Sequence, residues 1–178
     1  SRSLSESVPP VIVRPPVPED WMFVVAVPSE AQGLSGARER QALGALPPVR
    51  PEHAGTISRV VLMQLLPALV EDDIAGFGQA LTEIQRLVGD AFAPAQGGRY
   101  ASTTVSSCGD GMPRVGGSGA GQSSWGPACY GLTRGIDGVA RLERAAKLVL
   151  GSAPGGGVFA SAVSNRGATI RRGGEHHF

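Results

Sequence analysis

The stretch GAGQSSWGPACYG, residues 119–131, places a glycine-rich run directly before a glutamine, two serines and a tryptophan. Glycines let a backbone approach a ligand closely, and successive N–H groups can bind an anion. The chain has no Gly-Lys pair for a P-loop, and Gln122 replaces the last glycine of a dinucleotide-binding pattern. A flexible surface loop is the competing interpretation, but a linker rarely ends in Trp-Gly-Pro. We therefore predict a substrate- or phosphate-binding turn made of Gly119, Gly121, Gln122, Ser123, Ser124 and Trp125.

A second polar glycine turn precedes this stretch. Its residues are Gln96, Gly97, Gly98 and Arg99, and the arginine is able to hold a phosphate through two parallel N–H groups. An ordinary loop between elements is the alternative. The pair Asp72 and Asp73 offers oxygen ligands for Mg²⁺, although capping of a helix explains it better. The histidines do not form a Ser/His/Asp arrangement: His53 is isolated, and His176 and His177 belong to the tail.

Composition narrows the class of protein. The 178 residues suffice for one domain, and a net charge of +1 argues against a nucleic-acid-binding surface. The two cysteines, Cys108 and Cys129, form neither a disulfide framework nor a zinc site. We find no apolar run of membrane-spanning length and no signal peptide, and we expect a cytoplasmic protein. The chain does not begin with methionine and resembles a segment of a longer polypeptide.

Apolar periodicity and turn residues predict the elements of one domain over residues 20–172, between a Pro/Ser-rich linker or edge segment (1–19) and a tail (173–178). We expect loops over 93–102 and 106–119. Pro67 should kink or end its helix, Gly89 should end the next, and Asp137 should cap the last. Expected strands cover 21–27, 128–132, 157–163 and 167–172, the last two as a hairpin, and expected helices cover 37–43, 55–70, 74–88 and 138–150.

Few of the connections between these elements are compatible with a parallel, doubly wound sheet. It favours an α+β fold, in which an antiparallel sheet is backed by helices on one face.

Several segments carry a resemblance to a known family. The motif GQSSWGP (121–127) resembles a signature of β-ribofuranosylaminobenzene 5'-phosphate synthase, a non-kinase member of the GHMP kinase superfamily. The similarity covers about residues 10–171 and corresponds to the C-terminal half of that family, which implies a ferredoxin-like sandwich. Supporting segments are PEDWMFVVAVP (18–28), GLSGARER (33–40), LLPALVEDDIAGFGQALTEIQ (65–85), FAPAQGGRY (92–100) and SNRGATI (164–170).

The resemblance implies a reaction. The family condenses phosphoribosyl pyrophosphate with 4-aminobenzoate or a 4-hydroxybenzoate analogue, releases CO₂ and pyrophosphate, and leads to methanopterin-type one-carbon carriers. It usually requires Mg²⁺, for which we assign no ligands. By the same resemblance, GSGAGQSSWGP (117–127) would close the cleft opposite a glycine loop in an N-terminal half that this chain lacks. Gln122, Ser123 and Ser124 would contact substrate oxygens, and Trp125 would wall or pack the cleft.

Two departures from the family pattern stand out. SSCGDGMPRVGG (106–117) replaces an expected amphipathic helix, and Ala128 stands where the family often has threonine. Two other functions therefore remain open: a fragment of a GHMP small-molecule kinase that uses ATP, and a non-catalytic binding or interaction domain. We also consider a homodimer, and we expect neither nucleic acid nor a membrane as a partner.

Overall fold

A computed structural model describes residues 10–29, 36–151 and 156–168. Within these ranges four strands form one antiparallel sheet in the order β2-β3-β1-β4. The strands are β1 (Trp21–Val27), β2 (Gly119–Gln122), β3 (Cys129–Arg134) and β4 (Gly157–Ala162). The helices are α1 (Gly36–Ala45), α2 (Pro51–Val60), the π-helical turn η1 (Val61–Leu65), α3 (Leu66–Val70), α4 (Ile74–Gln96), α5 (Thr103–Arg114) and α6 (Gly135–Leu150).

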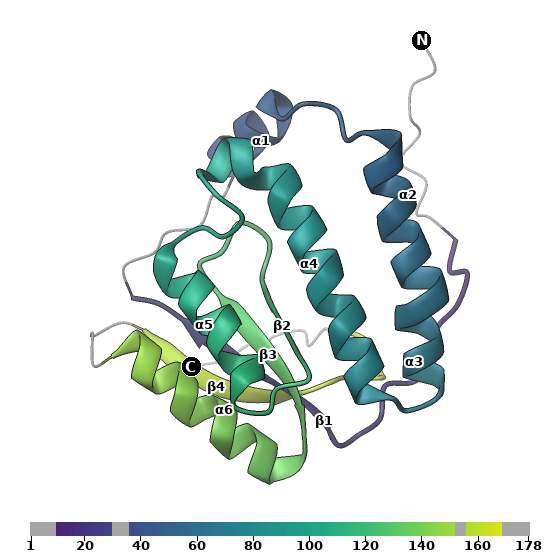
Figure 1. Ribbon diagram of the computed structural model, residues 1–178, viewed down its shortest axis with the longest axis vertical. Helices are drawn as coiled ribbons and strands as arrows, with labels where there is room; N and C mark the ends of the chain where they lie inside the picture. The colour runs from purple at the N-terminus through teal and green to yellow at the C-terminus, as the bar shows by residue number, and fades with distance from the viewer. Residues whose placement is uncertain (1–9, 30–35, 152–155, 169–178) are drawn as a thin grey trace, which may run out of the picture.

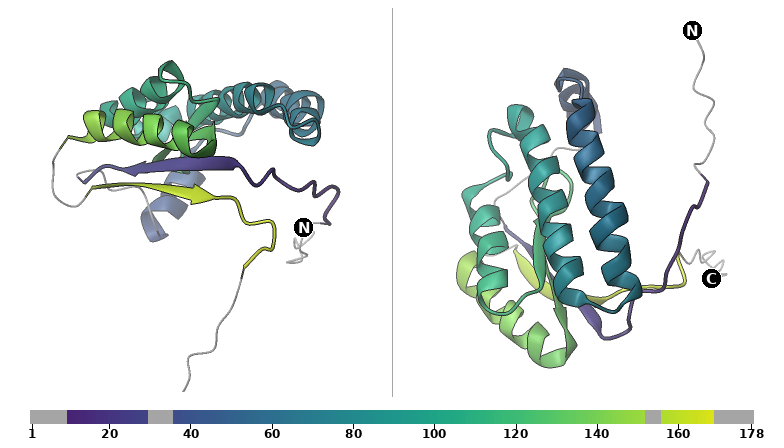
Figure 2. Two further views of the ribbon diagram at one scale, coloured as in Figure 1. Left: turned by 90° about the horizontal axis from the view of Figure 1, so that it is seen from below. Right: turned by 45° about the vertical axis from the view of Figure 1, so that its right-hand side comes forward.

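The helices α2 to α6 lie on one side of the sheet, as Figures 1 and 2 show. The fold is therefore the predicted α+β arrangement of an antiparallel sheet backed by helices. The apolar run 21–27 becomes β1, which lies between β3 and β4 and buries Trp21, Val24 and Ala26.

The main core lies between the sheet and the two helices α5 and α6. In this core, residues of β1, β2 and β3 pack against one side of each helix. The apolar residues of α5 and α6 recur at intervals of three and four residues, which places them on that side. Its two free cysteines, Cys108 on α5 and Cys129 on β3, are both buried, and their contact raises the pKa of the Cys129 thiol. The buried members are Val24, Ala26, Val105, Cys108, Met112, Ala120, Cys129, Leu142 and Ala146.

The helical segments α2, η1 and α3 form one continuous helix from Pro51 to Val70. Pro67 was expected to kink or end it, yet the helix continues for three more residues. Proline has no N–H to donate, and the π-helical turn just before it shifts the hydrogen bonding, so that the Leu66 N–H reaches the Val61 carbonyl. This helix of 20 residues contains an 18-residue window with a mean hydropathy of 1.3, so it is long and apolar enough to cross a membrane by length and composition only, a test that a core helix of a soluble protein also passes.

Helix α4 begins where the sequence predicted and ends later. The Asp73 side chain accepts hydrogen bonds from the N–H groups of Ala75 and Gly76, as an N-cap does. Gly89 was expected to end the helix but lies inside α4. A side chain at this position would overlap Arg99, which accounts for a glycine within the helix. The helix instead ends at Gln96, and the Gly97 that caps it adopts a left-handed φ of 82°.

Helix α5 corrects two expectations. Residues 103–114 are helical, although 106–119 was expected to be a loop, and of the expected loop 93–102 only residues 93–96 are helical, as the end of α4. The Ser102 hydroxyl caps the helix by accepting a hydrogen bond from the Val105 N–H. The stretch SSCGDGMPRVGG therefore supplies most of the helix that the family pattern requires, despite its glycines.

The last elements largely follow the prediction. Helix α6 begins at Gly135, so Asp137 lies in its first turn and is not its cap. Strand β4 pairs with β1, and the Asn165 side chain after it exchanges two hydrogen bonds with the Val17 backbone. Residues 167 and 168 are not in a strand, and 169–172, with the rest of the expected hairpin partner, lie outside the described residues.

Helix α4 and strand β2 are in direct backbone contact. A Cβ on Gly119 would lie 2.5 Å from the Gly78 carbonyl oxygen, and a Cβ on Gly78 would overlap the Ser118 carbonyl. Two residues further along β2, a Cβ on Gly121 would lie 2.6 Å from the Tyr130 hydroxyl. The glycines thus allow a helix, a strand and a tyrosine to pack without intervening side chains.

Replacing Gly78 with alanine should destabilise the fold. The new methyl group would force α4 away from β2, and overpacking of this kind typically lowers the free energy of unfolding by about 1–3 kcal/mol. Gly55→Ala is the matched control, because this exposed helical glycine has no neighbour within 4 Å and alanine favours helix, with an expected gain of about 0.5–1 kcal/mol. Urea denaturation of both variants measures the difference. Equal stabilities would contradict the close contact.

Tyr130 should ionise at high pH only. Burial raises its pKa to about 12, and burial also raises the pKa of Tyr100. Because the folded state favours the neutral phenol, the stability from this burial is fully present below pH ~10 and is lost as the pH rises toward ~12. The chain has only these two tyrosines. Tyrosinate absorbance of Tyr100→Phe should therefore report Tyr130 alone, and titration near pH 10 in the folded variant would contradict its burial.

Candidate functional site

The motif GAGQSSWGP forms a strand and a tight turn. Gly119–Gln122 is β2, and the turn to β3 closes through hydrogen bonds from the Ser123 N–H to the Ala128 carbonyl (2.8 Å) and from the Gly126 N–H to the Ser123 carbonyl (2.9 Å). Ser124 takes a left-handed φ of 50° within this turn. The side chains of Ser123 and Ser124 are exposed, and neither hydroxyl has a hydrogen-bond partner among the described residues.

The glycine run differs from the open anion-binding nest that we expected. Helix α4 supplies acceptors for the outer edge of β2, since the Ala120 N–H donates to the Thr82 hydroxyl (3.1 Å) and the Gln122 N–H donates to the Gln85 amide oxygen (3.3 Å). The N–H groups of Gly116 and Gly117 donate to carbonyls of α5. The glycines therefore serve close packing, and the polar groups left for a ligand are those of the turn.

The Gln122 side chain joins the two predicted turns. Its amide oxygen accepts a hydrogen bond from the Ala101 N–H (2.7 Å), and its amide nitrogen donates to the Ser124 carbonyl (2.9 Å) and to the Gln96 amide oxygen (3.3 Å). Only 6% of Gln122 is exposed. The sequence predicted Gln122 as a substrate contact, and the structure shows that its side chain already holds the Ser123–Ser124 turn to the loop after α4.

Trp125 anchors the same turn to α4. It is 4% exposed, and its ring stacks on Phe92 with a centroid separation of 4.5 Å and an interplanar angle of 25°. Trp125 was expected either to form a wall of the cleft or to pack beside it, and in the structure it packs against α4. Together, the aromatic stack and the Gln122 hydrogen bonds hold the turn from two sides.

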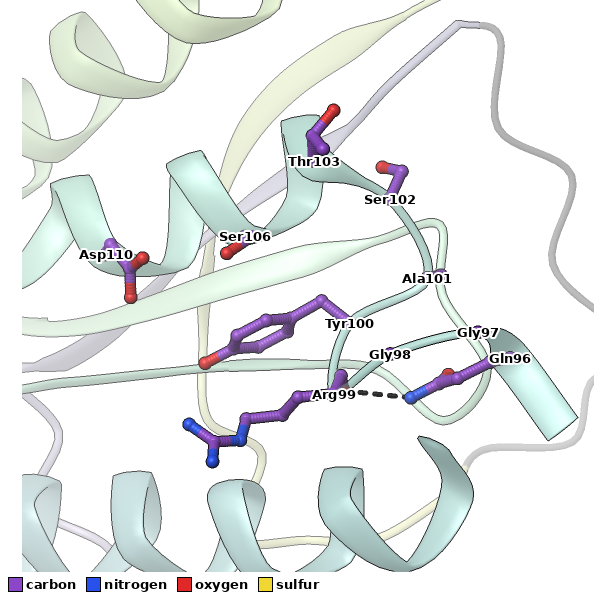
Figure 3. Close-up of a pocket in the computed structure, with 10 residues that line it drawn as sticks. All are labelled: Gln96, Gly97, Gly98, Arg99, Tyr100, Ala101, Ser102, Thr103, Ser106 and Asp110. Carbon is purple, nitrogen blue, oxygen red and sulfur yellow. Dashed lines mark hydrogen bonds between the residues drawn. The ribbon is translucent and has the colours of Figure 1, made fainter. Parts of the chain in front are cut away.

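A pocket of about 460 Å³ opens beside the joined turns. Its walls are the loop after α4 and the first half of α5, and it includes the whole predicted turn Gln96–Arg99 (Figure 3). Ser106 and Asp110 project from α5 on the side of the Tyr100 ring. The lining residues are Gln96, Gly97, Gly98, Arg99, Tyr100, Ala101, Ser102, Thr103, Ser106 and Asp110.

Arg99 is paired within the chain. Its guanidinium donates two hydrogen bonds to the Asp90 carboxylate, at 2.7 and 3.2 Å, and this pairing holds the pKa of Asp90 below its usual value. Arg86 lies near the same carboxylate at 3.6 Å and pairs with Glu83 at 2.7 Å. The network of two acids and two arginines is neutral overall, so Arg99 does not give the pocket an unbalanced positive charge. Phosphate binding by Arg99 stays a prediction.

The N-terminus of α5 supplies the pocket with polar groups that sequence analysis missed. Ser102, Thr103, Ser106 and Asp110 all line the cavity, and the start of a helix carries free N–H groups and a partial positive charge. The glycines at 109 and 111 and Pro113 concealed this helix. The signal that would have found it is Ser102 as a cap, followed by Val105, Cys108 and Met112 at helical spacing.

The side chains of the two candidate carboxylates, Asp72 and Asp73, have partners within the protein. The Asp72 carboxylate accepts a hydrogen bond from the Trp21 indole (3.0 Å) and pairs with Arg134, while Asp73 caps α4. The helix-cap interpretation therefore holds for Asp73, whereas Asp72 connects Trp21 and Arg134. Within residues 10–29, 36–151 and 156–168, no group of three or more His, Cys, Asp or Glu side chains is placed to hold a metal ion. His176 and His177 lie outside the described residues.

Two named proteins match this chain in sequence. The chain is 35% identical over 133 residues to the β-ribofuranosylphenol 5'-phosphate synthase of Methanothermobacter thermautotrophicus. This alignment covers 75% of the chain and 39% of that protein. The chain is 36% identical over 124 residues to the enzyme of the same name from Archaeoglobus fulgidus, with coverages of 70% and 36%. The chain thus spans less than half the length of these relatives. No family model matches it.

Solved structures confirm the fold. A homoserine kinase from Cytophaga hutchinsonii aligns over 85% of this chain and 44% of its own, with a TM-score of 0.53 and 16% identity. The mevalonate kinase of L. major, in complex with R-mevalonate, aligns over 81% and 43%, with a TM-score of 0.60 and 15% identity. Both are GHMP kinases, so the predicted superfamily fold is confirmed. Over the matched part of its length, this chain is similar in sequence to two proteins named β-ribofuranosylphenol 5'-phosphate synthase, and it has the fold of the GHMP kinases.

Proposed function

We propose that this chain is the C-terminal part of a synthase that joins phosphoribosyl pyrophosphate to a 4-substituted benzoate and releases CO₂ and pyrophosphate. The observation that carries the proposal is the 35% identity over 133 residues to a protein named β-ribofuranosylphenol 5'-phosphate synthase. A ribosylated phenol is the product expected from 4-hydroxybenzoate after loss of its carboxylate. We therefore name 4-hydroxybenzoate as the first substrate to test and 4-aminobenzoate as the second.

The proposed chemistry balances without a redox step. The bond between ribose C1 and the pyrophosphate oxygen breaks, and pyrophosphate leaves with the electron pair. The ring carbon that carries the carboxylate donates electrons to C1 and forms the new carbon–carbon bond. Cleavage of the bond to the carboxylate then returns an electron pair to the ring, restores aromaticity and releases CO₂. Such a reaction requires positioning of two anions and exclusion of water more than covalent help from the protein.

The pocket offers groups suited to that task. The start of α5 favours negative charge, while the Asp110 carboxylate further along the same helix opposes it. Outside the pocket lining, the exposed Ser123 hydroxyl of the adjoining turn can donate to a phosphate or carboxylate oxygen. Gln122 would act as a positioning residue, because its polar atoms already bond to the two turns. No group of three or more metal-ligating side chains occurs among the described residues, so we assign no ligands to Mg²⁺ and derive no step through it. The remaining walls would come from the part of the polypeptide that corresponds to the rest of the relatives' length.

Two alternatives use the same fold. A GHMP small-molecule kinase would transfer a phosphoryl group from ATP, and the likeness to homoserine kinase and mevalonate kinase supports that fold without supporting that activity. A non-catalytic domain would bind a partner and turn over neither substrate. The following assay separates all three.

Carboxyl-labelled 4-hydroxybenzoate should lose its label as CO₂ when the native full-length protein is incubated with phosphoribosyl pyrophosphate. One labelled CO₂ should appear per pyrophosphate released, because both leave in the same condensation. Parallel reactions contain labelled 4-aminobenzoate, or ATP in place of phosphoribosyl pyrophosphate. Phosphoryl transfer from ATP without release of CO₂ would identify a kinase, and absence of turnover in every reaction would favour the binding domain.

Ser123→Ala and Gln122→Ala should affect the protein differently. The Ser123 hydroxyl is exposed and unbonded within the described chain, so its removal should leave the melting temperature unchanged and lower kcat/KM roughly tenfold through loss of one contact to a charged substrate. Gln122→Ala leaves the Ala101 N–H without its partner and should lower both activity and stability, the latter by about 1–3 kcal/mol. Ser107→Ala, on the exposed side of α5, is the control. Unchanged kinetics of Ser123→Ala would contradict a substrate contact.

A further inference from the structure

One side of helix α5 lines the pocket with polar side chains. Ser102, Ser106 and Asp110 recur every four residues, the spacing that places side chains on the same side of a helix. The other side of α5 is apolar and buries Val105 and Met112 in the main core. Burial of that side therefore holds the polar side of α5 toward the cavity.

Tyr100 supplies the same cavity with an aromatic ring. In Figure 3 the ring lies beside α5, and Ser106 and Asp110 project from the helix on the side of the ring. A Cβ built on Gly109 would lie 3.9 Å from the Tyr100 hydroxyl oxygen, so the polar end of the ring is next to the residue that precedes Asp110. Burial, and then the negative charge of Asp110, raise the pKa of the Tyr100 hydroxyl, in agreement with this proximity. The ring and the carboxylate therefore belong to one part of the pocket.

Asp110 contributes a carboxylate with an unused capacity to accept hydrogen bonds. In the part of the chain that the structure describes it takes no part in an ion pair, whereas Arg99 of the same lining is paired with Asp90. A carboxylate opposes another anion but accepts strong hydrogen bonds from hydroxyl and amino groups. The pocket thus offers an acceptor for a neutral donor beside a surface for an aromatic ring. Both 4-hydroxybenzoate and 4-aminobenzoate carry such a donor para to their carboxylate.

The reaction proposed above requires a proton acceptor at that donor. When the ring carbon that carries the carboxylate bonds to ribose C1, positive charge develops on the para group, and its proton becomes acidic. A carboxylate in hydrogen-bond contact accepts this proton as a general base and thereby stabilises the transition state. When the bond to the carboxylate breaks and its electron pair restores the aromatic ring, the proton returns to the para oxygen or nitrogen. The protein carboxylate is then regenerated.

We propose that Asp110 is a catalytic residue, which binds the 4-hydroxyl or 4-amino group of the benzoate and accepts its proton as the carbon–carbon bond forms. The Tyr100 ring packs against the ring of the substrate and holds the para group at the carboxylate. This inference rests on the function proposed above and assigns the aromatic substrate to the Tyr100 and Asp110 part of the pocket. It also explains an acidic residue beside anionic substrates, because Asp110 contacts the end of the benzoate that carries no negative charge.

Binding is measured by titration calorimetry with the native full-length protein, without phosphoribosyl pyrophosphate so that no turnover occurs. The probes are 4-hydroxybenzoate, 4-aminobenzoate and 4-fluorobenzoate, the last of which has no para proton to donate. The wild-type protein should bind the two donors about tenfold more tightly than 4-fluorobenzoate, and Asp110→Ala should reduce this preference to within about threefold. Tyr100→Leu should weaken the binding of all three probes alike, and Tyr100→Phe, which keeps the ring, should weaken it much less.

Release of labelled CO₂ separates hydrogen bonding from proton acceptance. In Asp110→Asn the amide oxygen accepts a hydrogen bond but not a proton, so this variant should keep part of the binding preference while its kcat falls about 100-fold. Asp137→Asn is the matched control, because it makes the same change at an exposed carboxylate of α6 outside the pocket lining. It should retain wild-type binding and turnover. Circular dichroism and the melting temperature show whether each variant is folded.

The outcomes distinguish this inference from the function on which it rests. If the wild-type protein releases no CO₂, the proposed reaction and the proton transfer both fail, and the probes then decide the binding role. Equal affinities for the three probes would overturn that role as well. Wild-type turnover with an unchanged kcat in Asp110→Asn would overturn this inference alone. A lower melting temperature of Asp110→Ala with an unchanged probe preference would assign the carboxylate to a contact within the polypeptide, and would equally overturn it.

Discussion

The backbone of α4 touches the backbone of β2 at Gly78 and Gly119, and the arrangement of the candidate site follows from that contact. With no side chains between them, Thr82 and Gln85 of the helix come close enough to accept hydrogen bonds from the N–H groups of Ala120 and Gln122. An edge strand that would otherwise expose its N–H groups is thereby covered. The side chain of Gln122 then lies beside the loop that follows α4, where it joins the two turns.

The side chains of the motif GQSSWGP divide into two groups. Gln122 and Trp125 face inward and hold the turn, while Ser123 and Ser124 face outward. The pocket is lined by the loop after α4 and by the N-terminal part of α5, so its walls come from one continuous stretch of the sequence, Gln96 to Asp110. Arg99 is balanced by Asp90 and Asp110 adds a carboxylate to the lining, so the start of α5 is the remaining source of partial positive charge in the pocket.

Much of the fold was predictable from periodicity and capping residues. The buried strand 21–27, the cap at Asp73 and the stripe of α6 are local signals, and each of these elements formed as expected. Gly89 and α5 were mispredicted for one reason. Glycine usually signals a break, but Gly89 lies inside α4 and admits the Arg99 backbone, a contact made by a residue outside that helix, and the glycines of α5 do not interrupt it. The two turns of the site were identified separately, but their joining by Gln122 could not be foreseen, because it spans 21 residues of sequence.

The π-helical turn at Val61–Leu65 has a consequence for comparing this chain with its relatives. A π-helical turn holds more residues than an α-helical one, so the helix takes up one residue there without a change of direction. A relative that lacks one residue in this segment would regain an ordinary α-helix and still present Ala68 and Leu69 to the same neighbours. A single-residue gap within 61–65 is therefore compatible with an unchanged fold, whereas a gap beside Gly78 or Gly119 would separate the glycines that let α4 and β2 meet.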